Sequence, residues 1–153
     1  MINYRFIEKK PSVDEWTYIR SKVAWSIEAR TDFEIAIQNT LFAICVYDFN
    51  KIIGMGRVLG DNKICFYIQD VAVIPEYQNQ GIGQKIMWFI LKYINSNASP
   101  NATIGLFSSF GKESFYEKFG FITRPNNEKG CGMYLEYPLI ETYLNQYPNY
   151  IML

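Results

Sequence analysis

The stretch Asp70-Val71-Ala72-Val73-Ile74-Pro75-Glu76-Tyr77-Gln78-Asn79-Gln80-Gly81-Ile82-Gly83 decides the fold of this chain. It contains an apolar strand through Val73, which Pro75 ends, and then a polar turn with two glycines that leads directly into an amphipathic helix. The first N–H groups of a helix lack partners in that helix and lie at the positive end of its dipole. Glycines let an anion approach this backbone closely. The stretch therefore predicts a site for a phosphate-bearing ligand; the alternative is a strand-to-helix connection that binds nothing.

Two common phosphate-binding motifs do not fit this turn. A P-loop needs Gly-Lys followed by Ser or Thr, and the chain has no such triplet. A Rossmann fingerprint needs a small residue three positions after the second glycine, where this chain has Ile86. It also needs an acidic residue about twenty positions further on, and the Ser/Asn/Pro-rich stretch near there offers none.

The turn instead resembles the Gln/Arg-x-x-Gly-x-Gly/Ala signature of the GNAT superfamily of acetyl-CoA-dependent N-acetyltransferases, through Gln78-Asn79-Gln80-Gly81-Ile82-Gly83. A second segment, Ser114-Phe115-Tyr116-Glu117-Lys118-Phe119-Gly120-Phe121, resembles the Phe-Tyr-Glu-Lys-x-Gly-Phe segment that closes the catalytic core of that superfamily. The resemblance covers roughly residues 41–137. It implies an α/β (α+β) fold in which about four helices flank a mixed, mostly antiparallel sheet of six to seven strands. The fourth and fifth strands are expected to splay apart and form a cofactor cleft.

The pattern of the chain agrees with an alternation of helices and strands. Capping signals at Ser12 and Thr31 predict two helices, the first of which runs to about Ala24. A core-facing helix follows the glycine turn, with a short helix at 111–119 and one more helix in the tail 138–153. Strands are predicted at residues 3–8, 41–48, 52–59, 63–73, 102–107, 121–124 and 133–137.

Length and composition favour one enzyme domain over residues 1–153, since a chain of 153 residues can bury one substantial core. Lys plus Arg equals Asp plus Glu, 15 each, so no basic field predicts a nucleic-acid or membrane partner. The longest apolar run, residues 86–91, is too short to span a bilayer. The first residues lack the apolar region of a signal peptide, so we expect a cytoplasmic protein. A homodimer is left open.

The chain contains no histidine, which excludes Ser-His-Asp and Cys-His catalysis and histidine metal sites. Three cysteines, an odd number, argue against a disulfide framework. We expect Cys45 and Cys65 to pack in strands as small apolar residues and Cys131 to lie in a loop. No metal is expected.

The resemblance implies how acetyl-CoA binds. Backbone N–H groups of residues 78–84 are expected to hold the pyrophosphate, while a strand freed by a β-bulge pairs with the pantetheine arm. Ser109 stands where family members often carry a cofactor-binding Asn, and its shorter side chain could donate one hydrogen bond. We expect Lys112 to be solvated, with a contact to a cofactor phosphate as the alternative. The predicted cofactor-binding residues are Val71, Ala72, Val73, Gln78, Asn79, Gln80, Gly81, Ile82, Gly83, Gln84 and Ser109.

The resemblance also assigns catalytic roles. Tyr116 matches the tyrosine that protonates the departing thiolate; the alternative is a packed aromatic residue. Asp70 is the best-placed carboxylate to hold or deprotonate the acceptor amine, with a structural hydrogen bond as the alternative. Glu28 is second, with a surface charge as its alternative. Tyr67 falls where some histone-type members place a glutamate base, so that role does not carry over.

The function implied is acetyl transfer from acetyl-CoA to a primary amine of an unidentified acceptor, by direct attack with Tyr116 as general acid. A small-molecule amine is favoured, because aromatic residues such as Trp16, Trp25 and Phe33 suggest a small enclosed pocket. One alternative is a non-catalytic acyl-CoA-binding module on the same fold, since fold does not determine function. The other is a protein-lysine acetyltransferase, which would need an open, acidic groove.

Overall fold

The computed structural model of the chain describes residues 4–135 and 137–146. It divides into two compact units, residues 1–107 and residues 108–153. The first unit holds the sheet, three α-helices and the glycine turn, and the second holds two further helices. The single domain over 1–153 stays a prediction.

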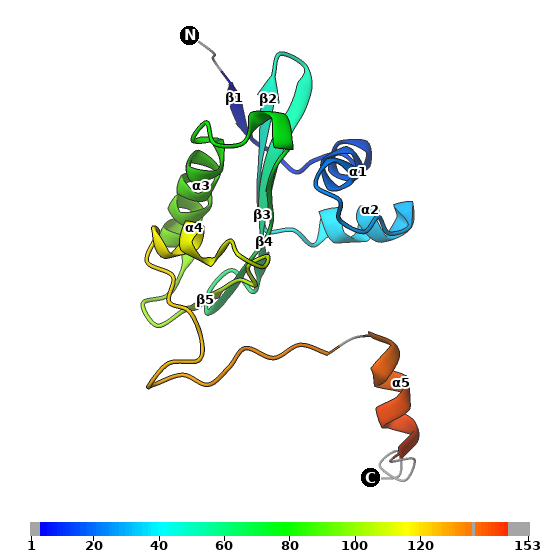
Figure 1. The fold of residues 1–153 in the computed structure, drawn as a ribbon, viewed down its shortest axis with the longest axis vertical. Helices are drawn as coiled ribbons and strands as arrows, with labels where there is room; N and C mark the ends of the chain where they lie inside the picture. The colour runs from blue at the N-terminus through cyan, green and yellow to red at the C-terminus, as the bar shows by residue number, and fades with distance from the viewer. Residues whose placement is uncertain (1–3, 136, 147–153) are drawn as a thin grey trace. The chain divides into compact units, whose positions relative to one another are not determined.

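The first unit is built on one sheet of five strands in the order β1-β2-β3-β4-β5 (Figure 1). The β1–β2, β2–β3 and β3–β4 pairs are antiparallel, and the β4–β5 pair is parallel. This confirms the mixed, mostly antiparallel sheet, with five strands instead of six to seven. The strands are β1 (Arg5–Glu8), β2 (Phe42–Asp48), β3 (Lys51–Gly60), β4 (Cys65–Val73) and β5 (Thr103–Gly105).

The closing strands expected at 121–124 and 133–137 are wrong as far as the described residues go, because no strand follows β5 among them. The first candidate is cut off by Pro125, which has no N–H to donate to a strand ladder. Just beyond it, the Asn126 side chain accepts hydrogen bonds from the N–H groups of Glu128 and Lys129, each at 2.9 Å. Such a local turn competes with strand pairing.

The helices are α1 (Val13–Lys22), α2 (Arg30–Gln38), α3 (Ile82–Asn97), α4 (Glu113–Glu117) and α5 (Tyr137–Gln146), with a 3₁₀ turn η1 (Pro75–Tyr77). The capping box of α1 is confirmed: the Ser12 hydroxyl accepts from the Glu15 N–H, and the Glu15 carboxylate accepts from the Ser12 N–H. The cap at Thr31 is wrong. α2 begins at Arg30 after Ala29, without a side-chain cap, so Thr31 lies inside its first turn. The helix expected in the tail is confirmed as α5.

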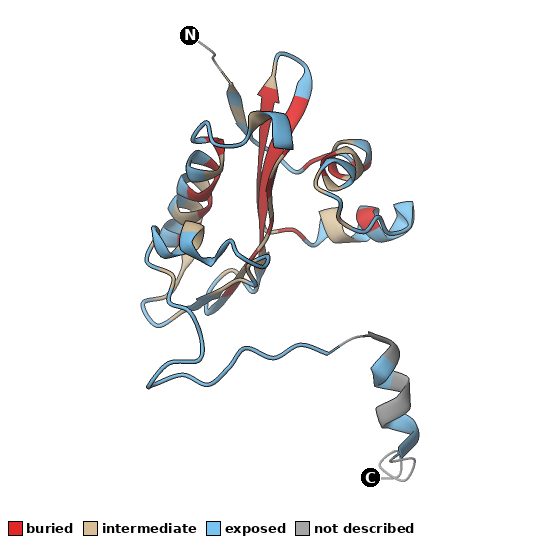
Figure 2. Cartoon of the chain, in the orientation of Figure 1, coloured by how far each residue is buried: buried red, intermediate tan, exposed pale blue. Residues whose placement is uncertain are grey.

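The helices of the first unit cover both faces of the sheet, with α1 and α2 on one side and α3 on the other (Figure 1). The buried residues concentrate along β2 and β3, between these helices (Figure 2). α3 lies unusually close to β3 at Gly56. A Cβ added there would lie 2.7 Å from Ile86 Cγ2 and 2.9 Å from Ile90 Cδ1, closer than real Cβ contacts allow. Glycine at this position therefore lets α3 pack against the strand.

We expect Gly56→Ala to lower the free energy of unfolding by about 1–3 kcal/mol, because the added methyl overpacks the contact between β3 and α3. The matched control is Gly105→Ala on β5, where an added Cβ meets no described atom within 4 Å. Urea unfolding followed by circular dichroism measures both variants. Equal stabilities for the two variants would contradict this account of the packing.

Candidate functional site

β4 carries one extra residue opposite β3. Arg57 pairs with Gln69 and Met55 pairs with Ala72, so two steps along β3 face three steps along β4. Asp70 lies at this irregularity with a φ of +52°, in the left-handed region. An extra residue of this kind is a β-bulge, which bends a strand and interrupts its hydrogen-bond ladder. The bulge implied by the GNAT resemblance is therefore present, and Asp70 is part of it.

On the edge of β4 that faces away from β3, the pairing with β5 ends partway along the strand. β5 pairs with it only through Cys65, Phe66 and Tyr67. Further along, the Phe107 N–H donates to the Tyr67 hydroxyl at 3.1 Å, a side chain, instead of to the β4 backbone. Within the described part of the chain, residues 68–73 thus have no strand partner on that edge. The two strands diverge as expected, and this open stretch contains the three strand residues assigned to the cofactor.

The N-terminus of α3 is open to a negative group. Its N-cap is Gly81, whose φ of +78° is one that glycine adopts without strain. Within the described residues no side chain caps the helix, and its first turn contains no acidic residue. Lys85 N–H donates to the Gly81 carbonyl at 3.1 Å, so the N–H groups of residues 82–84 precede the helical hydrogen-bond ladder. Among the residues that the structure describes, a Cβ at Gly81 would meet only Gln84 Oε1, at 3.8 Å.

Gln78 connects the end of β4 to this turn. Its backbone N–H donates to the Pro75 carbonyl at 3.2 Å, and its side-chain Nε2 donates to the Val73 carbonyl at 2.8 Å. Among the N–H groups assigned to the cofactor, that of Gln78 is therefore engaged within the protein. The side-chain contact to Val73 was not predicted, because the sequence pattern assigns the turn only backbone roles.

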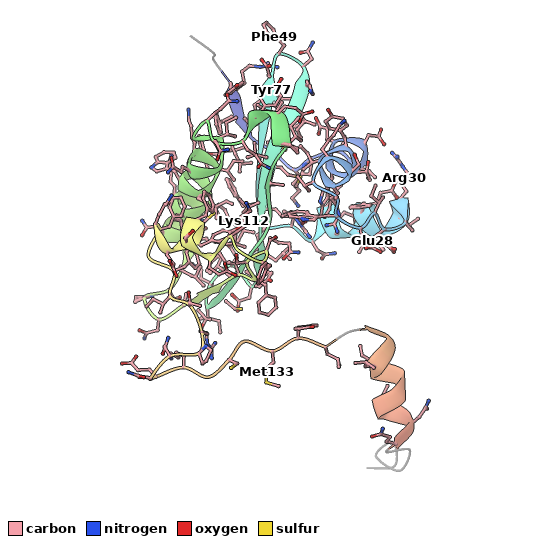
Figure 3. All side chains as sticks on the ribbon, in the orientation of Figure 1. Glu28, Arg30, Phe49, Tyr77, Lys112 and Met133 are labelled. Atoms are coloured by element: carbon pink, nitrogen blue, oxygen red, sulfur yellow. The ribbon has the colours of Figure 1, made fainter. Side chains whose placement is uncertain are left out.

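Two tyrosines hold the turn in place from outside. The Tyr4 hydroxyl donates to Gln80 Oε1 at 2.7 Å, and the Tyr77 hydroxyl donates to Asp48 Oδ2 at 2.8 Å. Figure 3 shows Tyr77 near the end of the β2–β3 hairpin. Sequence reasoning missed both contacts, since they join residues 76 and 29 positions apart. The turn is thus fastened to the N-terminal segment and to the hairpin.

Asp70 is buried between two arginines. Its Oδ2 accepts from Arg57 Nε at 2.6 Å and its Oδ1 from Arg20 Nη1 at 2.9 Å, while the residue is 5% exposed. Arg57 also donates to Thr40 Oγ1 at 3.1 Å, and its guanidinium lies 4.2 Å from the centre of the Trp16 ring. Both carboxylate oxygens already accept from guanidinium groups, which favours the structural role left open for Asp70. Its role toward an acceptor stays a prediction.

Arg20 extends this network to the connection between α1 and α2, residues 23–29. Its Nε donates to the Ser26 carbonyl at 2.6 Å and its Nη2 to the Ser26 hydroxyl at 3.1 Å. The guanidinium carbon lies 5.7 Å from the centre of a Trp25 ring. The Ser26 hydroxyl donates to Glu28 Oε1 at 3.0 Å, and Glu28 is exposed (Figure 3). The second predicted carboxylate thus lies at the surface of the segment that Arg20 holds.

The second unit carries Tyr116 on α4, which is shorter than the predicted helix 111–119. The Tyr116 ring is half-buried and contacts Phe115 and Phe121 edge to face, with ring centres 5.0 and 6.2 Å apart. Ser109 and Lys112 are exposed in the segment before α4, where the Lys112 N–H donates to the Ser109 carbonyl at 3.0 Å. The roles of Tyr116, Ser109 and Lys112 toward the cofactor stay predictions.

Tyr67 lies on β4 among the residues that pair with β5. Burial, together with the nearby charge of Asp70, raises the pKa of Tyr67 despite the hydrogen bond from the Phe107 N–H. Its phenol therefore stays protonated at neutral pH. Among the described residues 4–135 and 137–146, no cluster of three or more Cys, Asp or Glu could hold a metal ion.

The three cysteines differ in exposure. Cys45 is buried in β2, and burial raises the pKa of its thiol to about 12. Cys131 is exposed, as a loop position would be. The prediction that Cys65 is packed is wrong, because it is the first residue of β4 and lies exposed at the end of the strand.

A thiol reagent at neutral pH should modify Cys65 and Cys131 quickly, and Cys45 only after the protein unfolds. Mass spectrometry of the native protein against time measures this order. Three thiols that react at one rate would contradict it. A native Cys65→Ser/Cys131→Ser protein should react with the thiol reagent hardly at all, so it suits assays that detect released thiol.

The sequence of this chain is similar to those of known proteins. The family model described as "Acetyltransferase (GNAT) domain" matches residues 20–133. "Uncharacterized N-acetyltransferase ycf52" from Gracilaria tenuistipitata var. liui is 34% identical over 116 residues, which are 73% of this chain and 63% of that protein. The chain thus spans slightly less than two thirds of this relative. No helix in the described ranges has both the length and the apolar character needed to cross a membrane.

Solved structures share the fold. A probable acetyltransferase of unknown function from meticillin-resistant Staphylococcus aureus is 32% identical, with a TM-score of 0.80 over 88% of this chain and all of that one. N-acetylglutamate synthase from Neisseria gonorrhoeae, complexed with coenzyme A and L-arginine, gives a TM-score of 0.65 at 14% identity. It covers 97% of this chain and 32% of the synthase, and shows the fold alone. From its family match and its relatives, this chain belongs to the GNAT family of acetyltransferases.

Proposed function

We propose that this acetyltransferase moves an acetyl group from acetyl-CoA to a primary amine, with Tyr116 as general acid. The observation that carries the proposal is the bulged, open edge of β4 directly before the uncapped N-terminus of α3. An open strand edge offers backbone groups to an extended amide-containing chain, and an uncapped helix start offers N–H groups to phosphates. CoA contains both ligands in one molecule, since its pantetheine arm is an extended amide-containing chain and its pyrophosphate supplies the phosphates.

The residues fit acetyl-CoA in order along the chain. Val71, Ala72 and Val73 would pair with the pantetheine arm, and the N–H groups of residues 79–84 would bind the pyrophosphate. The known complex of a related fold with coenzyme A supports this choice of ligand. The bound thioester supplies an activated acetyl group. A backbone N–H at the bulge would polarise its carbonyl.

Tyr116 would supply the proton that the departing thiolate needs. In the reaction a C–N bond forms, the C–S bond breaks, the amine loses a proton and the sulfur gains one. A phenolic hydroxyl is one of the groups that act as general acids in enzymes. The Phe115 and Phe121 contacts support a defined orientation of the ring on α4.

The acceptor would approach from the side of α1 and α2, where Glu28 is exposed and Asp70 is held by two arginines. We propose a small amine, since half-buried Trp25 lies in the connection beside Arg20. The cytoplasmic location, the lack of nucleic-acid and membrane partners, and the oligomeric state stay predictions. Thiol release measured with amines, aminosugars, polyamines and lysine peptides tests the reaction itself. No release with any of them, despite CoA binding, would favour the acyl-CoA-binding module.

Gly81→Val should abolish detectable binding of CoA in calorimetry while the protein stays folded. The added side chain projects into the space before the helix N-terminus, and valine is strained at a φ of +78° by roughly 1–2 kcal/mol. Phe49→Val places the same residue at another left-handed position, φ +50°, in the β2–β3 hairpin, and should bind CoA normally. Unchanged affinity in Gly81→Val would place the cofactor elsewhere.

Tyr116→Phe should lower kcat by up to ~10²–10⁴-fold, the usual contribution of a general acid, with little change in the Kd of acetyl-CoA. The change removes one oxygen and little packing. Tyr134→Phe, at an exposed tyrosine in the same unit, is the matched control and should keep wild-type kinetics. Steady-state kinetics with an amine from the screen measure both. A wild-type kcat in folded Tyr116→Phe would make this residue structural.

A further inference from the structure

The two faces of β4 offer different access to the bulge. A Cβ at Gly56 would lie 3.5 Å from Val71 Cγ2 and 2.7 Å from Ile86 Cγ2, so the Val71 side chain points to the face that α3 covers. Asp70 contacts Arg20 and therefore points to the opposite face, toward α1. On that face Ile86 and Ile90 of α3 pack directly over Gly56 beside Val71, which leaves no room for an amine at this point of the sheet. An acceptor that reaches an acetyl group held at the bulge must come from the α1–α2 side.

The segment beside the bulge on that side is the connection 23–29. Trp25 is half-buried there, and Ser26, Ile27 and Glu28 are exposed, so this segment presents aromatic, hydroxyl and carboxylate groups to solvent. It has little regular structure of its own, and Ala24 within it has a φ of +57°. A segment of this kind needs side-chain contacts to hold one conformation.

Arg20 supplies these contacts and joins them to the bulge. Its three nitrogens donate separately: Nη1 to Asp70, Nε to the Ser26 carbonyl and Nη2 to the Ser26 hydroxyl. The side chain is 15% exposed, and the Asp70 side chain is 2% exposed. The Arg20 guanidinium thus joins Asp70 at the bulge to Ser26 in the connection 23–29.

We propose that Arg20 is a positioning residue, which sets the connection 23–29 against the bulge of β4 and so aligns the acceptor amine with the acetyl group. The inference rests on the proposed function and identifies what organises its acceptor side. Arg20 acts through Ser26 and Asp70 and touches neither substrate. Asp70 then serves the acceptor indirectly, as the fixed anion to which Arg20 is bound.

Arg20→Lys separates the contact with Asp70 from the contacts with Ser26. A lysine keeps a positive charge for Asp70, but its single ammonium group lacks the planar fork that reaches Ser26 at the same time. We expect the KM of the acceptor to rise on the order of 10–10²-fold, the range produced by small misplacements of a reacting group. The Kd of acetyl-CoA should stay within about twofold of wild type. General damage to the site would instead change both this Kd and the acceptor KM. Hydrogen exchange of amides 23–29 should become faster.

The acceptor in these assays is the best amine from a panel of spermidine, glucosamine 6-phosphate and a lysine tetrapeptide. Arg30→Lys is the matched control, because Arg30 lies at the end of the same connection and forms exposed ion pairs with Asp14 and Glu34. It should leave both constants unchanged. Ser26→Ala removes the hydroxyl contact and leaves the Arg20–Asp70 pair intact. It should raise the acceptor KM less than Arg20→Lys does, and non-additively with it.

An unchanged acceptor KM in folded Arg20→Lys, or an equal loss of acetyl-CoA affinity, would overturn the inference. If Arg20→Lys does not fold, Ser26→Ala decides, and a wild-type KM in that variant overturns it. If the wild-type protein binds acetyl-CoA but acetylates none of the panel, unchanged exchange at residues 23–29 in Arg20→Lys overturns it. A wild-type protein that neither binds acetyl-CoA nor acetylates an amine refutes the proposed function itself, before any variant is made.

Discussion

The rest of this structure depends on the β-bulge at Asp70. Two guanidinium groups bind the buried carboxylate of Asp70 and hold the bulge in place. A left-handed φ outside glycine costs on the order of 1 kcal/mol, and a bulge gives up regular strand pairing. Arg57 from β3 and Arg20 from α1 bind the Asp70 carboxylate from two elements and hold the strand in this conformation. Removal of one partner from a buried ion pair typically costs about 3–5 kcal/mol, because it leaves the other charge buried and uncompensated.

The bulge gives β4 two different halves. Its first residues pair with both β3 and β5, whereas among the described strands the last residues pair only with β3. Beyond the strand the Ile74 N–H still donates to the Ile53 carbonyl at 2.9 Å, so the chain stays attached to β3 until it enters η1 and the glycine turn. The side chains of this half support the core while one backbone edge stays open. A strand can do both because its side chains and its hydrogen bonds point in perpendicular directions.

Sequence reasoning predicted the parts of this arrangement that depend on neighbouring residues. The capping box at Ser12, the N-terminus of α3 at Gly81 and the core stripe of α3 are local patterns. It could not predict the partners of Asp70, which lie 50 and 13 positions away, or that Arg57 in a predicted strand would be 8% exposed. The closing strands were overpredicted, since β-branched and aromatic residues indicate a strand only where a partner strand is available.

In the proposed reaction the two substrates reach β4 from different directions, the cofactor along its open edge and the acceptor from the α1–α2 face. Both substrates would then meet the strand residues at the bulge, so the register of β4 against β3 matters greatly. A slip of one residue would turn each side chain of the strand to the opposite face. Pairing with β5 could prevent such a slip, but it would also close the edge that the cofactor needs. The register is held instead from the other edge and by a side chain: β4 stays paired with β3, and the Asp70 carboxylate is bound from β3 and from α1. The open edge and the fixed register can therefore coexist, because the bonds that fix the strand are not the bonds that the ligand would use.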